Sequence, residues 1–129
     1  MGDETPASDS RILRTVPTGR LDELRLAATR DLDFATERQA RAELHAAMES
    51  TGPTEWTQCL LDASRVFVDV RGLEVLLEGA ELARSLGREL MVVAPRSLRV
   101  MCQALDVGDR LPLRQPPMER GTADGGVSS

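Results

Sequence analysis

The stretch VFVDVRGLEVLL, residues 66–77, decides the fold class because its hydrophobic pattern changes in the middle. Its first part, residues 66–68, is a run of β-branched and aromatic residues that is typical of a buried strand. From Leu73 onward the apolar residues recur every three or four positions, which predicts a helix. The stretch therefore predicts a strand that leads directly into a helix, with the turn at Asp69, Val70, Arg71 and Gly72.

The sequence on both sides of this stretch alternates in the same way. Residues 12–16 and 23–30 predict two strands that pair antiparallel across a Pro-Thr-Gly turn. Further strands are predicted at residues 58–64, 90–94 and 111–113, and helices at 33–50, 73–86 and 98–105. The order β-β-α-β-α-β-α-β predicts an α/β fold in which helices pack against a mixed central sheet of about four to five strands.

Capping and stop residues predict where the helices begin and end. Thr36 and Gln39 have the spacing of a capping box in the first helix, and Gly52 and Pro53 would close it. Gly87 is a natural stop for the second helix. The third helix has an apolar stripe, made of Leu98, Met101, Cys102 and Leu105.

Composition excludes several classes of function. A net charge of -5 and a pI near 4.9 argue against a nucleic-acid-binding surface. No apolar run approaches the roughly 20 residues that span a bilayer, and no export signal opens the chain, so we expect a cytoplasmic protein and no membrane partner. Cys59 and Cys102 form no CxxC pair, and His45 is the single histidine, so we expect two core cysteines, no metal and no cofactor.

Residues 59–113, CLLDASRVFVDVRGLEVLLEGAELARSLGRELMVVAPRSLRVMCQALDVGDRLPL, resemble the STAS domain of bacterial anti-sigma factor antagonists. The family pattern is an apolar strand, Asp-Leu-Ser, Asp-Ser-Ser-Gly-Leu, an amphipathic helix, a strand and a Pro-led helix. Upstream, RDLDFAT, residues 30–36, resembles the family's Gly-Glu-Leu-Asp-x-Ala-Thr segment. The resemblance implies the STAS fold and a protein-binding module rather than an enzyme.

The resemblance also assigns individual positions. Asp62 and Ser64 match Asp-Leu-Ser, and Asp33 closes the early acidic segment. Three of the five places in Asp-Ser-Ser-Gly-Leu are kept, by Asp69, Gly72 and Leu73, whereas Val70 and Arg71 replace the two serines.

In the family, an anti-sigma factor that is also a kinase phosphorylates the second serine, and the phosphorylated antagonist is released. The resemblance places Arg71 at this position. An arginine has no hydroxyl to accept phosphate, so we expect no phosphorylation there. Ser64 and Ser97 are alternative phosphorylation sites, although Ser97 is also expected in the first turn of the third helix.

Three interpretations of Arg71 follow. Its guanidinium could bind an acidic patch on a partner through paired hydrogen bonds. Its length could instead block a kinase, or it could form only a local ion pair with Asp69 or Asp33. Asp69 itself has the position of a helix N-cap, which requires no other function.

The ends of the chain depart from the family. We expect a disordered N-terminus over residues 1–10, a STAS domain over 11–115 and a flexible tail over 116–129, which is rich in Pro and Gly. Without a further helix after the last strand, one sheet face would be less covered. We expect a second copy in a homodimer, or another partner, to cover it.

The sequence thus predicts a non-catalytic module that binds an anti-sigma factor of the kinase type and releases a sigma factor. The predicted contact surface consists of Asp33, Asp69, Val70, Arg71, Gly72 and Leu73. One alternative is a STAS scaffold subunit in a stress-sensing or lipid-transport assembly. A small-molecule or nucleotide sensor is another, against which the lack of a Gly-rich phosphate loop argues.

Overall fold

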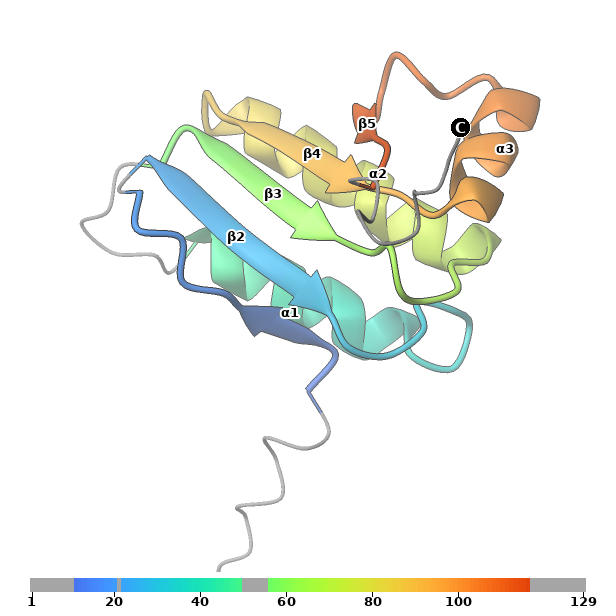
Figure 1. The fold of residues 1–129 in the computed structure, drawn as a ribbon, viewed down its shortest axis with the longest axis horizontal. Coiled ribbons are helices and arrows are strands. Elements are labelled where there is room, and N and C mark those ends of the chain that lie inside the picture. The colour runs from blue at the N-terminus through green and yellow to red at the C-terminus, as the bar shows by residue number, and fades with distance from the viewer. Residues whose placement is uncertain (1–10, 21, 50–55, 117–129) are drawn as a thin grey trace, which may run out of the picture.

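The elements follow one another in the predicted order β-β-α-β-α-β-α-β (Figure 1). The structure is a computed structural model that describes residues 11–20, 22–49 and 56–116. The strands are β1 (Leu13–Thr15), β2 (Glu23–Ala28), β3 (Gln58–Asp62), β4 (Glu89–Val93) and β5 (Leu113–Arg114). The helices are α1 (Glu37–Glu49), α2 (Val70–Ser85) and α3 (Arg96–Leu105). The predicted disordered N-terminus, most of the predicted tail and the helix end at Gly52 and Pro53 lie outside the described residues.

The five strands form one mixed sheet in the order β1-β2-β3-β4-β5. β1 and β2 pair antiparallel as predicted, and the other neighbours are parallel, each joined through a helix. Because parallel strands end at the same edge of a sheet, the loops that follow β2, β3 and β4 gather there. This edge includes the turn at residues 69–72.

The core lies between the sheet and the helices α1 and α2, which cover the same face (Figure 1). Leu26, Leu61 and Val92 stand side by side in register across the middle of the sheet, and all are buried. Leu44 of α1 and Leu76 of α2 are buried in the same cluster. Burying side chains of this size stabilises the fold by about 1.5–3 kcal/mol each.

The helix ends confirm one prediction and shift another. Gly87 ends α2 with φ 74°, and the N–H of Arg88 donates to the carbonyl of Ala83, as in a Schellman motif. A capping box is present one turn earlier than predicted, because residues 34–36 already form a turn that leads into α1. The N–H of Thr36 donates to Asp33 Oδ1 at 3.1 Å, and the N–H of Asp33 donates to Thr36 Oγ1 at 3.0 Å.

The apolar stripe of α3 is buried except at its end. Leu98 and Cys102 belong to the core, whereas Leu105 is 50% exposed at the helix end. Along the described part of the chain, we find no helix that is both long and apolar enough to cross a membrane.

Candidate functional site

Two loops at the carboxyl edge of the sheet are joined by backbone hydrogen bonds. The β2–α1 loop, residues 29–36, lies beside the β3–α2 loop, residues 63–69 (Figure 1). The N–H of Leu32 donates to the carbonyl of Phe67 at 2.9 Å, and the N–H of Asp69 donates to the carbonyl of Leu32 at 3.1 Å. Leu32 and Val68 thus form a parallel bridge, which holds the two loops together.

Each loop also uses an aspartate to hold the backbone of the other. Asp31 Oδ1 accepts a hydrogen bond from the N–H of Phe67 at 2.9 Å. Asp69 Oδ2 accepts one from the N–H of Phe34 at 3.2 Å. Both carboxylates satisfy backbone donors in segments without regular secondary structure, so they fix the shape of the loops.

Asp69 has a second role as the N-cap of α2. Its backbone is extended, with φ -96° and ψ -171°, and its Oδ1 accepts from the N–H of Gly72 at 3.0 Å. This confirms the predicted N-cap, an interaction that contributes on the order of 1 kcal/mol. The same side chain therefore begins the helix and attaches the neighbouring loop.

Gly72 is buried where the two segments approach most closely. A Cβ atom built at Gly72 would overlap the carbonyl group of Leu32. That carbonyl is held in place because it accepts the N–H of Asp69. Only glycine therefore lets the first turn of α2 pack against the β2–α1 loop.

Arg71 lies on the outer side of this turn with its side chain 52% exposed. Its Nη1 is 3.8 Å from Glu37 Oε1 and 3.9 Å from Glu74 Oε1, and its guanidinium carbon is 5.7 Å from the centre of the Phe34 ring. Among the described residues, Arg71 therefore forms local ion pairs with these glutamates, and the interpretation that names Asp69 or Asp33 as the partner is wrong. The reason is that both aspartate carboxylates accept backbone N–H groups of their own turns.

Glu37 connects Arg71 to a second arginine between the helices. Glu37 Oε2 is 2.9 Å from Arg41, and Arg41 Nε is 2.6 Å from Glu78 on α2. Hydrogen bonds to Glu78 and Glu37 raise the pKa of Arg41. The glutamate that Arg71 approaches is thus already held by a closer partner.

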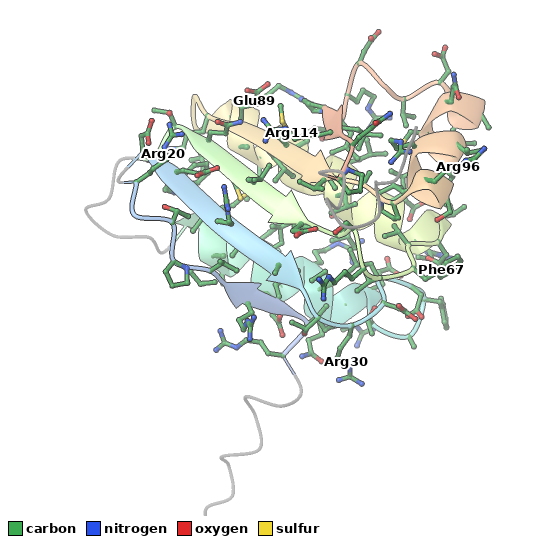
Figure 2. All side chains as sticks on the ribbon, viewed as in Figure 1. Arg20, Arg30, Phe67, Glu89, Arg96 and Arg114 are labelled. Atoms are coloured by element: carbon green, nitrogen blue, oxygen red, sulfur yellow. The ribbon has the colours of Figure 1, made fainter. Side chains whose placement is uncertain are left out.

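Three apolar side chains are exposed on these two loops and on the first residue of α2. Phe34 is 72% exposed, Phe67 53% and Val70 52%. The chain has two phenylalanines, and both lie on these loops rather than in the core (Figure 2 labels Phe67). Phe34, Phe67, Val70 and Arg71 are called the docking patch below.

The sequence reasoning included Val70 and Arg71 but missed both phenylalanines. A signal was available, because Phe34 directly follows Asp33 and Phe67 stands two residues before Asp69. Of the other predicted contact residues, Asp33 is half-buried, whereas Gly72 and Leu73 are buried. These three therefore shape the patch more than they expose side chains on it.

Asp62 and Ser64 form a separate local turn after β3. Asp62 Oδ1 accepts from the N–H of Ser64 at 2.9 Å and from its hydroxyl at 2.6 Å. The hydroxyl of Ser64 is thereby engaged. Ser97 is exposed in the first turn of α3, as predicted for an early-turn residue.

The chemistry of the remaining polar groups is limited. Burial raises the pKa of the Cys59 thiol to about 12 and also raises the pKa of Cys102, which disfavours a thiolate nucleophile. Within residues 11–20, 22–49 and 56–116, no group of three or more His, Cys, Asp or Glu side chains could hold a metal ion.

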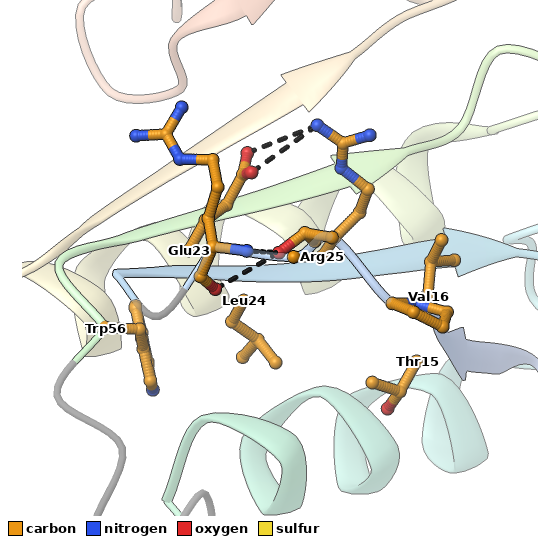
Figure 3. Close-up of a pocket in the computed structure, with 10 residues that line it drawn as sticks. Thr15, Val16, Glu23, Leu24, Arg25 and Trp56 are labelled. Carbon is orange, nitrogen blue, oxygen red and sulfur yellow. Dashed lines mark hydrogen bonds and ion pairs between the residues drawn. The ribbon is translucent and has the colours of Figure 1, made fainter.

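A pocket of about 430 Å³ lies at the other end of β2 (Figure 3). Its walls include Trp56, which is buried and stacked at 4.4 Å under the guanidinium of Arg88. Arg25 approaches Glu23 at 3.4 Å on the opposite side of the strand. This pocket contains none of the predicted site residues.

No family model matches the sequence, and no curated protein matches it either. Among solved structures, the anti-sigma factor antagonist SpoIIAA in its unphosphorylated form is similar, with 14% identity and a TM-score of 0.57 over 85% of this chain and 94% of that chain. The murine solute carrier 26 family member A9 anion transporter in its inward-facing state has 18% identity and a TM-score of 0.62. That match covers 74% of this chain but 16% of the transporter. The chain therefore has the fold of SpoIIAA, which confirms the predicted α/β STAS fold.

Proposed function

We propose that this chain is a non-catalytic binding module that docks on an anti-sigma factor of the kinase type and so releases a sigma factor. The proposal includes a cytoplasmic location, where sigma factors act, and no control by phosphorylation at residue 71. The observation that carries it is the docking patch, a braced but exposed surface at the place where the resemblance puts the phosphoacceptor serine.

The composition of the patch supports binding to a protein. Aromatic side chains and arginine are the residues most enriched where protein interfaces gain their affinity. Phe34 and Phe67 are exposed although phenylalanine is usually buried. The hydrogen bonds between the two loops already fix the backbone, which lowers the entropy lost on binding.

Arg71 supplies a charge that binding could use. Its contact with Glu74 is long and joins two half-exposed side chains, and such surface pairs contribute about 0–1 kcal/mol. Its contact with Glu37 is also long, at 3.8 Å, and Glu37 has a closer partner in Arg41. Exchanging these two contacts for a carboxylate on the partner therefore costs little. A phosphoserine here would be negative, whereas Arg71 keeps the patch positive, so the complex should persist in the presence of ATP.

The test is release of a sigma factor from its complex with an anti-sigma kinase of the same genome. Fluorescently labelled sigma factor reports release through its anisotropy. With ATP present, the wild-type protein should release sigma, and the release should last. Arg71→Ser should release sigma at first and then lose this effect, while its intact mass increases by one phosphate.

Two results would count against the proposal. Failure of the wild-type protein to release sigma from any of these complexes would remove the antagonist role and favour the scaffold alternative. Addition of phosphate to the wild-type chain would show that the protein is still switched. Ser64→Ala and Ser97→Ala variants would then locate the modified residue.

A further inference from the structure

A groove of about 450 Å³ extends from the docking patch along α2. One wall is α2, and the other is formed by the end of α3 and the connection from α3 to β5. Apolar side chains line both walls, namely Val70, Leu73, Leu77, Leu105 and Val107. Charged side chains form the rest of the lining, namely Glu74, Glu78, Glu81 and Arg110.

The wall on α2 consists of two parallel stripes. Val70, Leu73 and Leu77 follow one another at three and four residues and form the apolar stripe. Glu74, Glu78 and Glu81 have the same spacing one position further around the helix. Val70 is 52% exposed, whereas Leu73 and Leu77 are 2% and 8% exposed, so the floor beside the acidic rim is formed mainly by side chains that also pack in the core.

The opposite wall has the apolar side chains of Leu105 and Val107 together with Arg110. Asp106 adopts a left-handed conformation with φ 56°, and the N–H of Val107 donates to the carbonyl of Cys102, so the chain reverses there. Leu105 is left at the last position of α3 with half of its side chain exposed, beside the groove. An apolar residue kept exposed next to an apolar floor indicates an interaction surface.

Each glutamate of the rim has an arginine partner. The three glutamates face one arginine in the groove lining, and they are 50%, 46% and 61% exposed in chain order. Glu78 is held closely by Arg41 at 2.6 Å. By contrast, Glu74 pairs with Arg71 at 3.9 Å and Glu81 with Arg110 at 3.6 Å. These two pairs are long surface contacts that contribute about 0–1 kcal/mol, so a cation from a partner can replace them.

We propose that this groove receives an amphipathic helix of the partner, with apolar anchors in the groove and arginine or lysine on the edge that faces α2. This inference rests on the proposed function, because the groove begins at Val70 of the docking patch and one partner can reach both. Val70 and Leu77 are seven residues apart, about 10 Å along the helix axis. The anchors of a helix bound in a groove repeat over the same distance.

The test uses two labelled synthetic peptides with the same leucine face, one flanked by arginine and one by glutamate, and measures anisotropy. The arginine peptide should bind the wild-type protein, whereas the glutamate peptide should not. Leu105→Asp should weaken the binding of the arginine peptide at least tenfold. Val100→Asp is the matched control, because Val100 is 55% exposed on the same helix but does not line the groove. This variant should bind the arginine peptide with the affinity of the wild-type protein.

Glu74→Gln combined with Glu81→Gln should also weaken the binding of the arginine peptide, and this binding should depend less on salt concentration. Three results would overturn the groove: equal binding of the two peptides, equal binding to Leu105→Asp, or a dimer that Leu105→Asp dissociates. The last would assign the groove to a second copy. The peptide assay contains neither kinase nor sigma factor, so loss of sigma release with intact peptide binding would remove only the proposed function.

Discussion

Gly72 is the residue on which both the helix and the docking patch depend. Its backbone N–H is capped by Asp69, and its missing side chain makes room for the carbonyl of Leu32. A side chain there would collide with backbone rather than with a flexible side chain, so local rearrangement cannot relieve the overlap cheaply. The glycine thus helps to position its neighbour Arg71 through its capped N–H and through its close packing on Leu32.

Gly72→Ala should therefore lower the free energy of unfolding by about 2–3 kcal/mol, as overpacking does in well-packed sites. Urea denaturation followed by circular dichroism measures this difference. Gly108→Ala is the control, because nothing lies within 4 Å of a Cβ at Gly108, and it should change stability by less than about 0.5 kcal/mol. Equal stability of the two variants would show that the loops do not pack as described.

At the scale of elements, the sequence predicts the order of the strands and helices correctly because their patterns are local. The strand predicted at residues 66–68 is wrong, since β3 ends at Asp62 and only Val68 pairs, in an isolated bridge with Leu32. The helical stripe from Leu73 onward is visible without any partner segment. The same holds for Gly87, since a left-handed stop needs only its own residue. The predicted capping box was one turn late, because the pattern Thr36 to Gln39 does not reveal that Asp33 already caps the preceding turn.

The loops were predicted less well, for a physical reason. The hydrogen bonds from Phe34 to Asp69 and from Phe67 to Asp31 join residues 35 and 36 positions apart. No local pattern encodes such pairs. Apolar residues are assigned to the core by default, so the exposure of both phenylalanines and the pairing of Arg71 with Glu37 could be found only from the fold.

At the scale of the whole molecule, α1 and α2 cover one face of the sheet (Figure 1). The other face carries charged side chains, among them Glu89 and Arg114 at the sheet ends (Figure 2). The prediction that a second copy or a partner covers a less protected face stays a prediction. The docking patch lies at the carboxyl edge of the sheet, and the groove lies along α2. Neither lies on this less protected face.

The central strand makes the stability of the whole domain depend on pH. Cys59 of β3 is fully buried, and burial raises the pKa of its thiol from 9.0 to about 12. Between these values the unfolded chain has lost the proton that the folded chain keeps, so unfolding becomes easier as the pH rises. The free energy of unfolding should fall by up to about 1.4 kcal/mol per pH unit from this group.

Urea denaturation at several pH values above 8 should therefore show a steeper loss of stability in the wild-type protein than in Cys59→Ala. The variant starts from a lower stability because it leaves a small cavity, so the slopes are compared rather than the absolute values. Parallel slopes would contradict the burial of this thiol in the core.

The most direct test of the account is calorimetric titration of the anti-sigma kinase with the wild-type protein and with a variant carrying Phe34→Ala and Phe67→Ala. Both side chains are exposed, so their removal should leave the melting temperature nearly unchanged. Val100→Ala serves as the control for losing an exposed apolar side chain elsewhere. We predict that the double variant binds at least tenfold more weakly, while the control binds as the wild type does. Equal affinity of all three proteins would contradict the claim that these two loops form the docking surface.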